Sequence, residues 1–200
     1  MVEGSRLTPF PPTASKDALR KRALAGRNAL LPTERVRLSN AICAHLNGVR
    51  GAWGGPVAGY LPIRSEADIQ PFLAELALAG EAICLPRILP DDSLSFLSWK
   101  PGDALAQAGF GTLAPPDGVP VLNPRTVLVP LAAFDRHGGR IGYGKGFYDR
   151  ALAGLRQIGA VTAIGIAFSV QECDDIPVDA HDQPLDAVVT ETGLRSFVQV

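Results

Sequence analysis

The chain has 200 residues, of which 46% are hydrophobic and 20% charged, and its formal net charge is −1. This length suits one full-sized domain or two small ones, and the apolar content is too high for a disordered chain. A net charge near zero argues against a dedicated nucleic-acid or membrane-surface binder, because such proteins carry an excess of Lys and Arg. We therefore expect neither nucleic acid nor a membrane as a partner.

Charge is divided unevenly between the two ends of the chain. Residues 1–50 hold nine Lys or Arg against three Asp or Glu, whereas residues 171–200 hold seven acids against one Arg. One interpretation is a pair of oppositely charged faces that are simply solvated. The other is that a basic and an acidic element meet the same charged ligand, one directly and one through a metal ion.

No segment has the features of an export signal or a membrane span. Residues 1–14 are proline-rich and lack the apolar region of a signal peptide, and we expect them to form a flexible tail. The longest uncharged stretch, residues 157–171, is too short to cross a bilayer. Cys43, Cys84 and Cys173 lack the paired spacing of a zinc site or a disulfide framework. We therefore expect Cys84 to be a buried free thiol and the protein to be located in the reducing cytoplasm.

Helices and short apolar strands alternate over the first half of the chain. Ser15 can cap a first helix, in which Lys16 and Arg20 are four residues apart and share one face. Pro32 opens a second helix, and Gly80 ends a third. The expected helices cover about residues 16–30, 32–47 and 67–79, and the expected strands cover residues 56–61, 82–85 and, at a sheet edge, 94–99.

The second half continues this alternation after a segment rich in Pro and Gly. Residues 101–125 are predicted to be a long irregular connection, and a glycine-rich segment at 138–146 precedes a helix that begins near Tyr148. Short apolar strands without strict alternation are typical of a sheet covered on both faces. The sequence thus predicts a single three-layer α/β domain over residues 15–200, with a mostly parallel sheet and helices on both faces. Its remaining strands are expected at residues 127–131, 160–168 and 187–190.

The segment Phe134–Arg150 (FDRHGGRIGYGKGFYDR) has the features of an anion-binding loop. It follows a buried strand and precedes a helix, where open α/β sheets place ligands. Its five glycines allow main-chain N–H groups to converge, and the helix N-terminus adds partial positive charge. Arg140 and Lys145 supply two full charges. We interpret the segment as a phosphate-binding loop; the alternative is a tight glycine-rich turn with solvated cations.

Part of this segment imitates a different nucleotide-binding motif. Residues 139–145 satisfy G-x-x-x-x-G-K, the start of a P-loop. The next residue is Gly146, where a P-loop needs the Ser or Thr hydroxyl that holds Mg²⁺. We therefore reject a P-loop assignment.

The glycine-rich run resembles the signature of the 5-formyltetrahydrofolate cyclo-ligase family, also called 5,10-methenyltetrahydrofolate synthetases. The resemblance continues in order along residues 15–192, nearly the whole chain. The further matching segments are Lys16-x-x-x-Arg20, Tyr60-Leu61-Pro62 followed by Glu66, Cys84-Leu85-Pro86-Arg87, and Asp182-x-x-x-Asp186.

The resemblance implies the positions of an ATP site, a magnesium site and a folate site. It places two magnesium carboxylates at Asp149 and Asp182, and folate contacts at Leu61, Glu66, Tyr143 and Phe147. It gives Lys145 and Arg140 the catalytic work of neutralising phosphate charge. The ATP contacts that it implies are Lys16, Arg20, Arg140, Gly142, Tyr143, Gly144, Lys145, Gly146, Phe147 and Tyr148.

The implied reaction is the cyclisation of 5-formyltetrahydrofolate to 5,10-methenyltetrahydrofolate, driven by ATP with Mg²⁺ as cofactor. In the family mechanism the formyl oxygen is phosphorylated, N10 of the folate attacks the activated carbon, and ADP and phosphate are released. We expect a monomer with a small-molecule folate substrate. Two features depart from the family pattern: Ala114 stands where a Glu is frequent, and Phe147 where a Tyr is common.

Two other functions remain open from the residues. One is a folate-binding or buffering protein that retains the pocket without catalysis. The other is an enzyme acting on sugar phosphates through the same anion loop without ATP, although neither His45 nor His137 has an obvious partner for base catalysis.

Overall fold

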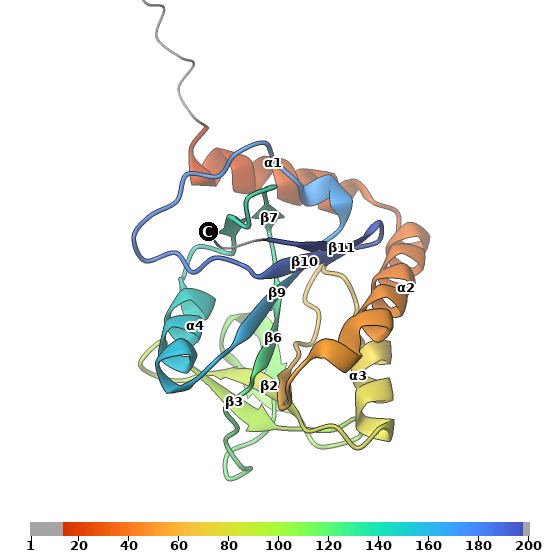
Figure 1. Ribbon diagram of the computed structural model, residues 1–200, viewed down its shortest axis with the longest axis vertical. Helices are drawn as coiled ribbons and strands as arrows, with labels where there is room; N and C mark the ends of the chain where they lie inside the picture. Colours follow the sequence, from red (N-terminus) through yellow and green to blue (C-terminus); the bar gives the residue numbers. More distant parts are fainter. Residues whose placement is uncertain (1–13, 198–200) are drawn as a thin grey trace, which may run out of the picture.

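A seven-stranded sheet runs through the middle of the computed structural model, which describes residues 14–197 (Figure 1). The order across the sheet is β11-β10-β9-β6-β1-β2-β3. The predicted tail of residues 1–14 lies outside the described residues, apart from Ala14. The sheet strands are β1 (Val57–Ala58), β2 (Ile83–Ile88), β3 (Leu94–Ser98), β6 (Thr126–Pro130), β9 (Thr162–Ile166), β10 (Ala187–Thr190) and β11 (Gly193–Ser196).

The five central strands are parallel and both edge strands are antiparallel to their neighbours. Strands β10, β9, β6, β1 and β2 pair in parallel, while β3 pairs antiparallel with β2 and β11 with β10. The prediction of a mostly parallel sheet is thus confirmed, as is the edge position of β3. The short antiparallel β11 was missed, because its four residues are exposed or half-buried and its one leucine, Leu194, gives no alternating apolar pattern.

Helices cover both faces of this sheet, which gives three layers (Figure 1). Helices α2 (Pro32–Val49) and α3 (Gln70–Leu78) pack on one face, and α4 (Phe147–Ile158) packs on the other. Successive residues of a strand pack into the cores on opposite faces of the sheet. In β6, for example, Leu128 packs with α2 and α3, and Val129 packs with α4. The predicted fold class, a three-layer α/β domain with helices on both faces, is confirmed.

Helix α1 (Lys16–Ala29) lies across the end of the sheet where β6 passes into β7 (Ala133–Phe134) (Figure 1). Its predicted cap is present, since the Ser15 hydroxyl accepts a hydrogen bond from the N–H of Ala18 at 3.3 Å. Leu19 and Ala23 form a small core with Ile141 of β8 (Arg140–Ile141). This position brings the amino end of α1 to the carboxyl ends of the parallel strands.

Several elements differ in extent from the sequence prediction: β1 and β9 are shorter than expected and β2 extends to Ile88. Three further differences concern α3, α2 and the connection at residues 101–125. Helix α3 begins at Gln70 rather than near residue 67, because the Asp68 side chain accepts a hydrogen bond from the Gln70 N–H at 2.9 Å and ends the preceding turn. Helix α2 continues through Gly48 to Val49. Residues 101–125 are not wholly irregular, since β4 (Ala106–Ala108) and β5 (Thr112–Ala114) form a small hairpin. Strands of three residues are too short to show a hydrophobic period.

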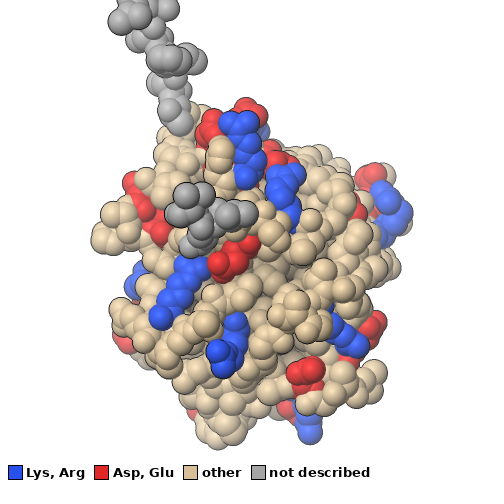
Figure 2. Space-filling model, in the orientation of Figure 1, with Lys and Arg blue, Asp and Glu red and all other residues tan. Residues whose placement is uncertain are grey.

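Charges of both signs are mixed on the face of the molecule seen in Figure 2. Blue and red side chains lie next to one another there, over α1 for example. Within α1, Lys21 and Arg20 pair with Asp17. Within residues 14–197, no helix combines the length and the apolar character that crossing a bilayer requires.

The core of the sheet leaves no room for a side chain at Gly165 in β9. A Cβ there would lie 2.6 Å from Leu131 Cδ1 and 2.7 Å from Leu185 Cδ1, and both leucines are fully packed. We expect Gly165→Ala to lower the free energy of unfolding by about 1–3 kcal/mol through overpacking. The matched control is Gly154→Ala on the exposed face of α4, where nothing lies within 4 Å of the new Cβ. There we expect a gain of about 0.5–1 kcal/mol from helix propensity. Urea unfolding curves measure both, and equal midpoints would contradict the prediction.

Candidate functional site

Two cavities lie side by side at the carboxyl ends of the parallel strands. The first, which we call the charged cavity, has a volume of about 340 Å³, and the second, the apolar cavity, has about 330 Å³. The glycine-rich loop lies between them and contributes Tyr143, Lys145 and Phe147 to both linings. The two cavities therefore share a wall that this loop forms.

The loop ends in the N-terminus of α4. Gly144 and Gly146 have φ angles of 93° and 65°, a left-handed conformation that favours glycine, and Gly146 is the N-cap of the helix. The first main-chain N–H groups of a helix have no partner within it, and the helix dipole places partial positive charge there. Since Gly146, Phe147 and Tyr148 line the charged cavity, this end of α4 is suited to an anion.

A buried carboxylate holds the start of the loop. Asp135 is 2% exposed, and its Oδ1 accepts hydrogen bonds from the N–H groups of His137 and Gly139, both at 2.8 Å. Its Oδ2 accepts a third, at 2.9 Å, from the N–H of Ile176 in the acidic segment near the C-terminus. A Cβ at Gly139 would lie 2.6 Å from Asp135 Oδ2, so this glycine is needed for the close approach. Asp135 thus ties the glycine-rich loop to the acidic segment.

In the charged cavity, Arg140 and Asp149 form an ion pair at 2.6 Å. The Asp149 carboxylate also accepts a hydrogen bond from the N–H of Gln183 at 3.0 Å, and Arg140 Nε donates to the Gln183 carbonyl at 2.9 Å. Burial lowers the pKa of Arg140, and the charge of Asp149 opposes this effect. The guanidinium remains charged, because the pKa of arginine is far above neutrality.

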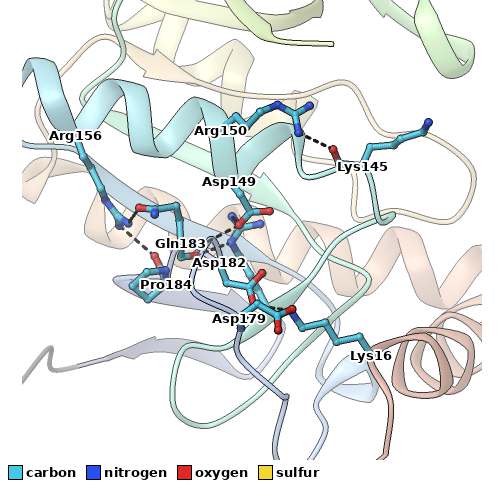
Figure 3. Close-up of polar contacts among 10 residues, drawn as sticks. Lys16, Lys145, Asp149, Arg150, Arg156, Asp179, Asp182, Gln183 and Pro184 are labelled. Atoms are coloured by element: carbon cyan, nitrogen blue, oxygen red, sulfur yellow. Dashed lines mark hydrogen bonds and ion pairs between the residues drawn. The ribbon is translucent and has the colours of Figure 1, made fainter.

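The opposite wall of the charged cavity joins α1 to the acidic segment. The Lys16 ammonium contacts Asp179 Oδ2 at 2.6 Å and Asp182 Oδ2 at 2.5 Å (Figure 3). Burial alone would lower the pKa of Lys16, but hydrogen bonds to the two carboxylates raise it above its ordinary value. Burial alone would raise the pKa of Asp182, but the hydrogen bond from the Asp179 N–H and the contact with Lys16 outweigh burial and lower it. Arg20 completes the wall by donating from Nε to the Gly142 carbonyl at 2.8 Å.

The apolar cavity contains a buried carboxylate, Glu66, which is 9% exposed. Its Oε2 accepts a hydrogen bond from the Ile63 N–H at 2.9 Å, and its Oε1 accepts one from the Tyr143 hydroxyl at 3.0 Å. That hydroxyl in turn accepts from Arg27, a fully buried arginine of α1, at 2.8 Å. Burial raises the pKa of Glu66, and the hydrogen bonds and the Arg27 charge only partly offset it.

Strand β2 and the β4–β5 hairpin form the far wall of the apolar cavity. Pro86, Ile88, Thr112 and Leu113 line it there. Arg87 links the two elements, since its guanidinium donates to the Pro115 carbonyl at 2.7 Å and pairs with Asp117 at 3.1 Å. The cavity is thus polar at the Glu66 end and apolar along the remaining walls, which suits a flat heterocycle with a few hydrogen-bonding groups.

Every residue that was expected to contact ATP, magnesium or folate lines one of these two cavities. The expected folate contacts Leu61, Glu66, Tyr143 and Phe147 line the apolar cavity. Lysine 145 is exposed and lines both. The charged cavity is lined by the expected ATP contacts Lys16, Arg20, Arg140, Gly142, Tyr143, Gly144, Lys145, Gly146, Phe147 and Tyr148, and by the expected metal ligands Asp149 and Asp182.

Three residues of the site were missed from the sequence. Arg27 continues the apolar spacing of Leu19 and Ala23 along α1, and a charge in such a stripe is a usable signal of a buried polar contact. Asp135 directly follows a buried strand and precedes two glycines, which is typical of a side chain that caps a turn. Asp179 gave no signal, being one of several acids in the same segment.

The chain matches a family model, described as the 5-formyltetrahydrofolate cyclo-ligase family, over residues 12–191. This match covers most of the sequence and both cavities. The chain belongs to the 5-formyltetrahydrofolate cyclo-ligase family. The resemblance inferred from the glycine-rich run is therefore confirmed.

Relatives named 5-formyltetrahydrofolate cyclo-ligase support the assignment. The relative from Escherichia coli K12 is 34% identical over 140 residues, which are 67% of this chain and 76% of the relative. The relative from Mycolicibacterium smegmatis is 32% identical over 187 residues, covering 88% of this chain and 93% of its own. The chain is accordingly an enzyme, a 5-formyltetrahydrofolate cyclo-ligase.

Solved structures of 5,10-methenyltetrahydrofolate synthetases share the fold of this cyclo-ligase. The NMR structure of the Aquifex aeolicus protein has a TM-score of 0.78 and 32% identity, covering 92% of this chain and 94% of that one. The Mycoplasma pneumoniae structure has a TM-score of 0.72 and 26% identity, covering 89% of this chain and 99% of that one. The α/β architecture described above is thus that of the family.

Asp135 provides a test of how the cyclo-ligase site is held together. Asp135→Asn replaces one acceptor oxygen by an NH₂ group, which then faces either the Ile176 N–H or the two loop N–H groups. We expect a loss of about 1–3 kcal/mol in the free energy of unfolding, because a buried donor is left without a partner. Asp103→Asn, whose carboxylate accepts one exposed main-chain hydrogen bond, is the control and should change stability by less than about 0.5 kcal/mol. Equal urea midpoints for the two variants would contradict the anchoring role.

Proposed function

We propose that this cyclo-ligase uses ATP and Mg²⁺ to convert 5-formyltetrahydrofolate into 5,10-methenyltetrahydrofolate, ADP and phosphate. The observation that carries the proposal is the junction of the two cavities. A cation-lined cavity at a helix N-terminus meets an apolar cavity with a buried carboxylate, and Tyr143, Lys145 and Phe147 border both. Such a junction suits the transfer of a phosphoryl group from a nucleotide to a folate.

The charged cavity is proposed to hold the triphosphate. Lys16, Arg20, Arg140 and Lys145 line it together with the first turn of α4. Main-chain N–H groups and full positive charges that converge on one point favour a phosphate chain. Arg140 is held rigidly by Asp149 and Gln183, so its charge is oriented before the nucleotide arrives.

Asp149 and Asp182 are proposed to hold the magnesium ion. Both line the charged cavity, and both present carboxylate oxygens, the ligands that Mg²⁺ prefers. Within residues 14–197 no cluster of three or more potential metal ligands occurs. A site of two carboxylates fits Mg²⁺ bound with a nucleotide, since the phosphates and waters supply the remaining ligands. When bound, the ion would neutralise charge on the phosphate oxygens.

The apolar cavity is proposed to hold the folate. Glu66 can accept hydrogen bonds from the N–H edge of the pterin, and Leu61, Tyr143 and Phe147 offer apolar and aromatic contacts at the same place. The aromatic rings of Tyr143 and Phe147 belong to the glycine-rich loop, so the bound pterin would lie against the loop that contacts the triphosphate. In the proposed complex, N5 and its formyl group point toward the charged cavity.

The reaction then needs positioning and charge neutralisation and no covalent nucleophile from the protein. The formyl oxygen attacks the γ-phosphorus, and the bond from that phosphorus to ADP breaks. N10 attacks the activated carbon and loses its proton, and the C–O bond breaks to release phosphate. Lys145 and Arg140 stabilise the charge that develops on the transferred phosphoryl group, while the cavity walls hold the reactants in line.

Both cavities are formed by one chain, which supports a monomer as the working unit. Cys43, Cys84 and Cys173 are free and buried thiols, which supports the reducing cytoplasm as the location. The predicted burial of Cys84 is confirmed, and burial raises its pKa to about 12.

A spectrophotometric assay tests the proposal. The methenyl product is followed by its absorbance with ATP and Mg²⁺ together, with each alone, and with neither. We expect product only when both are present. Tight folate binding without turnover would support a buffering protein instead, and turnover of a sugar phosphate without ATP would support the other alternative.

Lysine 145 is expected to contribute mainly to the chemical step. Because it lies where both cavities meet, Lys145→Ala should lower kcat by roughly 10²–10³, the scale of losing one oriented charge-stabilising donor. KM values for both substrates should change far less. Lys21→Ala, on the exposed outer face of α1, is the control and should retain full turnover. Wild-type turnover in Lys145→Ala would remove the loop from the phosphate role.

Glu66 gives a prediction about pH. Burial raises its pKa, so protonation begins at a higher pH than for an ordinary glutamate, and the protonated acid loses acceptor capacity toward the pterin. We expect KM for the folate to rise as pH falls toward this raised pKa. Glu66→Gln should raise that KM roughly 10- to 100-fold, as for a lost charged hydrogen bond, and should abolish its rise at low pH. The KM for ATP is the internal control. An unchanged pH profile in the variant would contradict the assignment.

A further inference from the structure

The glycine-rich signature ends in Arg150, a residue to which the proposed function gives no role. It lies in the first turn of α4, and its main-chain N–H donates to the Gly146 carbonyl at 3.1 Å. Its side chain extends along the amino end of the helix toward Lys145, and a dashed line marks their contact in Figure 3. The guanidinium donates from Nη1 to the main-chain carbonyl of Lys145 at 2.9 Å.

A second hydrogen bond connects Arg150 to a different part of the molecule. Nη2 donates to the main-chain carbonyl of Asp92 at 2.6 Å, in the turn between β2 and β3. Asp92 has a φ of 61°, and within the described chain only Arg64 among the other non-glycine residues also has a positive φ. This backbone conformation is unfavourable for a residue other than glycine. It persists only where the surrounding structure holds it, so the β2–β3 turn is held in place by its surroundings.

The loop also wraps closely around the guanidinium. The Arg150 Cζ lies 5.6 Å from the centre of the Phe147 ring, and a Cβ at Gly146 would lie 3.2 Å from Nη1. Lys145 and Phe147 thus contact one guanidinium through a carbonyl and an aromatic ring, and a side chain at Gly146 would crowd it. An ammonium could not replace it fully, because only the planar guanidinium offers several donors in a fixed fork.

We propose that Arg150 is a positioning residue that acts through Lys145. By fixing the main chain at Lys145 against the β2–β3 turn, Arg150 sets the position from which the Lys145 side chain reaches the wall that both cavities share. This inference rests on the proposed function, in which that ammonium stabilises the transferred phosphoryl group. Displacements of about 1 Å at such a group can cost about 10²-fold in rate, so the clamp has a measurable effect.

A double-mutant cycle separates this role from a general structural one. The cycle uses wild type, Arg150→Met, Lys145→Ala and the double variant, and the readouts are kcat and both KM values. We expect Arg150→Met to lower kcat by about 10- to 100-fold with KM for the folate changed less than threefold. In the Lys145→Ala background the same substitution should change kcat by less than twofold, because the group that it positions is gone.

Two further variants sharpen the result. Arg150→Lys retains one donor, and we expect its kcat to lie between those of wild type and Arg150→Met. Asp92→Asn removes the carboxylate charge but keeps the carbonyl that Arg150 binds and the tolerance for positive φ, so kcat should stay within twofold of wild type. Urea unfolding of each variant confirms that it is folded. If Arg150→Met does not fold, Arg150→Lys takes its place in the cycle.

The outcomes distinguish this inference from the proposed function. If Arg150→Met lowers kcat by the same factor with and without the Lys145 side chain, Arg150 does not act through Lys145 and the inference is overturned. If Lys145→Ala alone keeps wild-type turnover, the phosphate role of Lys145 in the proposed function fails. A loss of kcat in both single variants without further loss in the double variant supports both.

Discussion

The site depends on the buried carboxylate of Asp135, which forms no ion pair with any Lys, Arg or His of residues 14–197. Asp135 is held by three main-chain N–H groups, two from the turn that starts the glycine-rich loop and one from the segment after β9. These main-chain N–H groups replace the water that would otherwise solvate the Asp135 carboxylate. They can do so only if the loop and the segment after β9 both stay in place. Because these segments are 37 residues apart at Gly139 and Ile176, the anchor also sets the distance between the loop and the acids that face it.

Paired charges fill the cavity that this anchor creates. Arg140 is bound to Asp149, and Lys16 is bound to Asp179 and Asp182, so the basic N-terminal helix and the acidic C-terminal segment do meet. The uneven charge is therefore not divided between two separate faces at these residues, and a common charged ligand stays a prediction. Two of the proposed phosphate-binding cations contact a proposed metal carboxylate, Lys16 at Asp182 and Arg140 at Asp149. When a nucleotide binds together with its metal ion, the phosphates can take over the cations and the metal ion can take over the carboxylates. No buried charge is then left without a partner, and the cost of removing these charges from water is lower.

Much of this arrangement could be predicted from sequence, and the exceptions have physical reasons. The helices were found because their apolar spacing and caps are local, as at Ser15 and Gly80, and the central strands because they are continuous apolar runs. The site was found because five glycines, Arg140 and Lys145 occur in one segment. Short pairings such as β7 with β8 could not be found, since two residues show no period. Arg27 and Asp135 act through tertiary contacts, with partners 116 and 41 residues away along the chain.

The loop that separates the two cavities is also shared between them. Tyr143, Lys145 and Phe147 each face both sides, so a substitution in this wall alters the surroundings of two ligands at once. At these positions, a change that improves binding in one cavity therefore also affects binding in the other. Thr112 and Leu113 of the hairpin, together with Leu61, face the apolar cavity alone. With the folate in the apolar cavity, as proposed, substitutions at Thr112 and Leu113 alter its surroundings without altering the charged cavity, and the loop itself is expected to vary least.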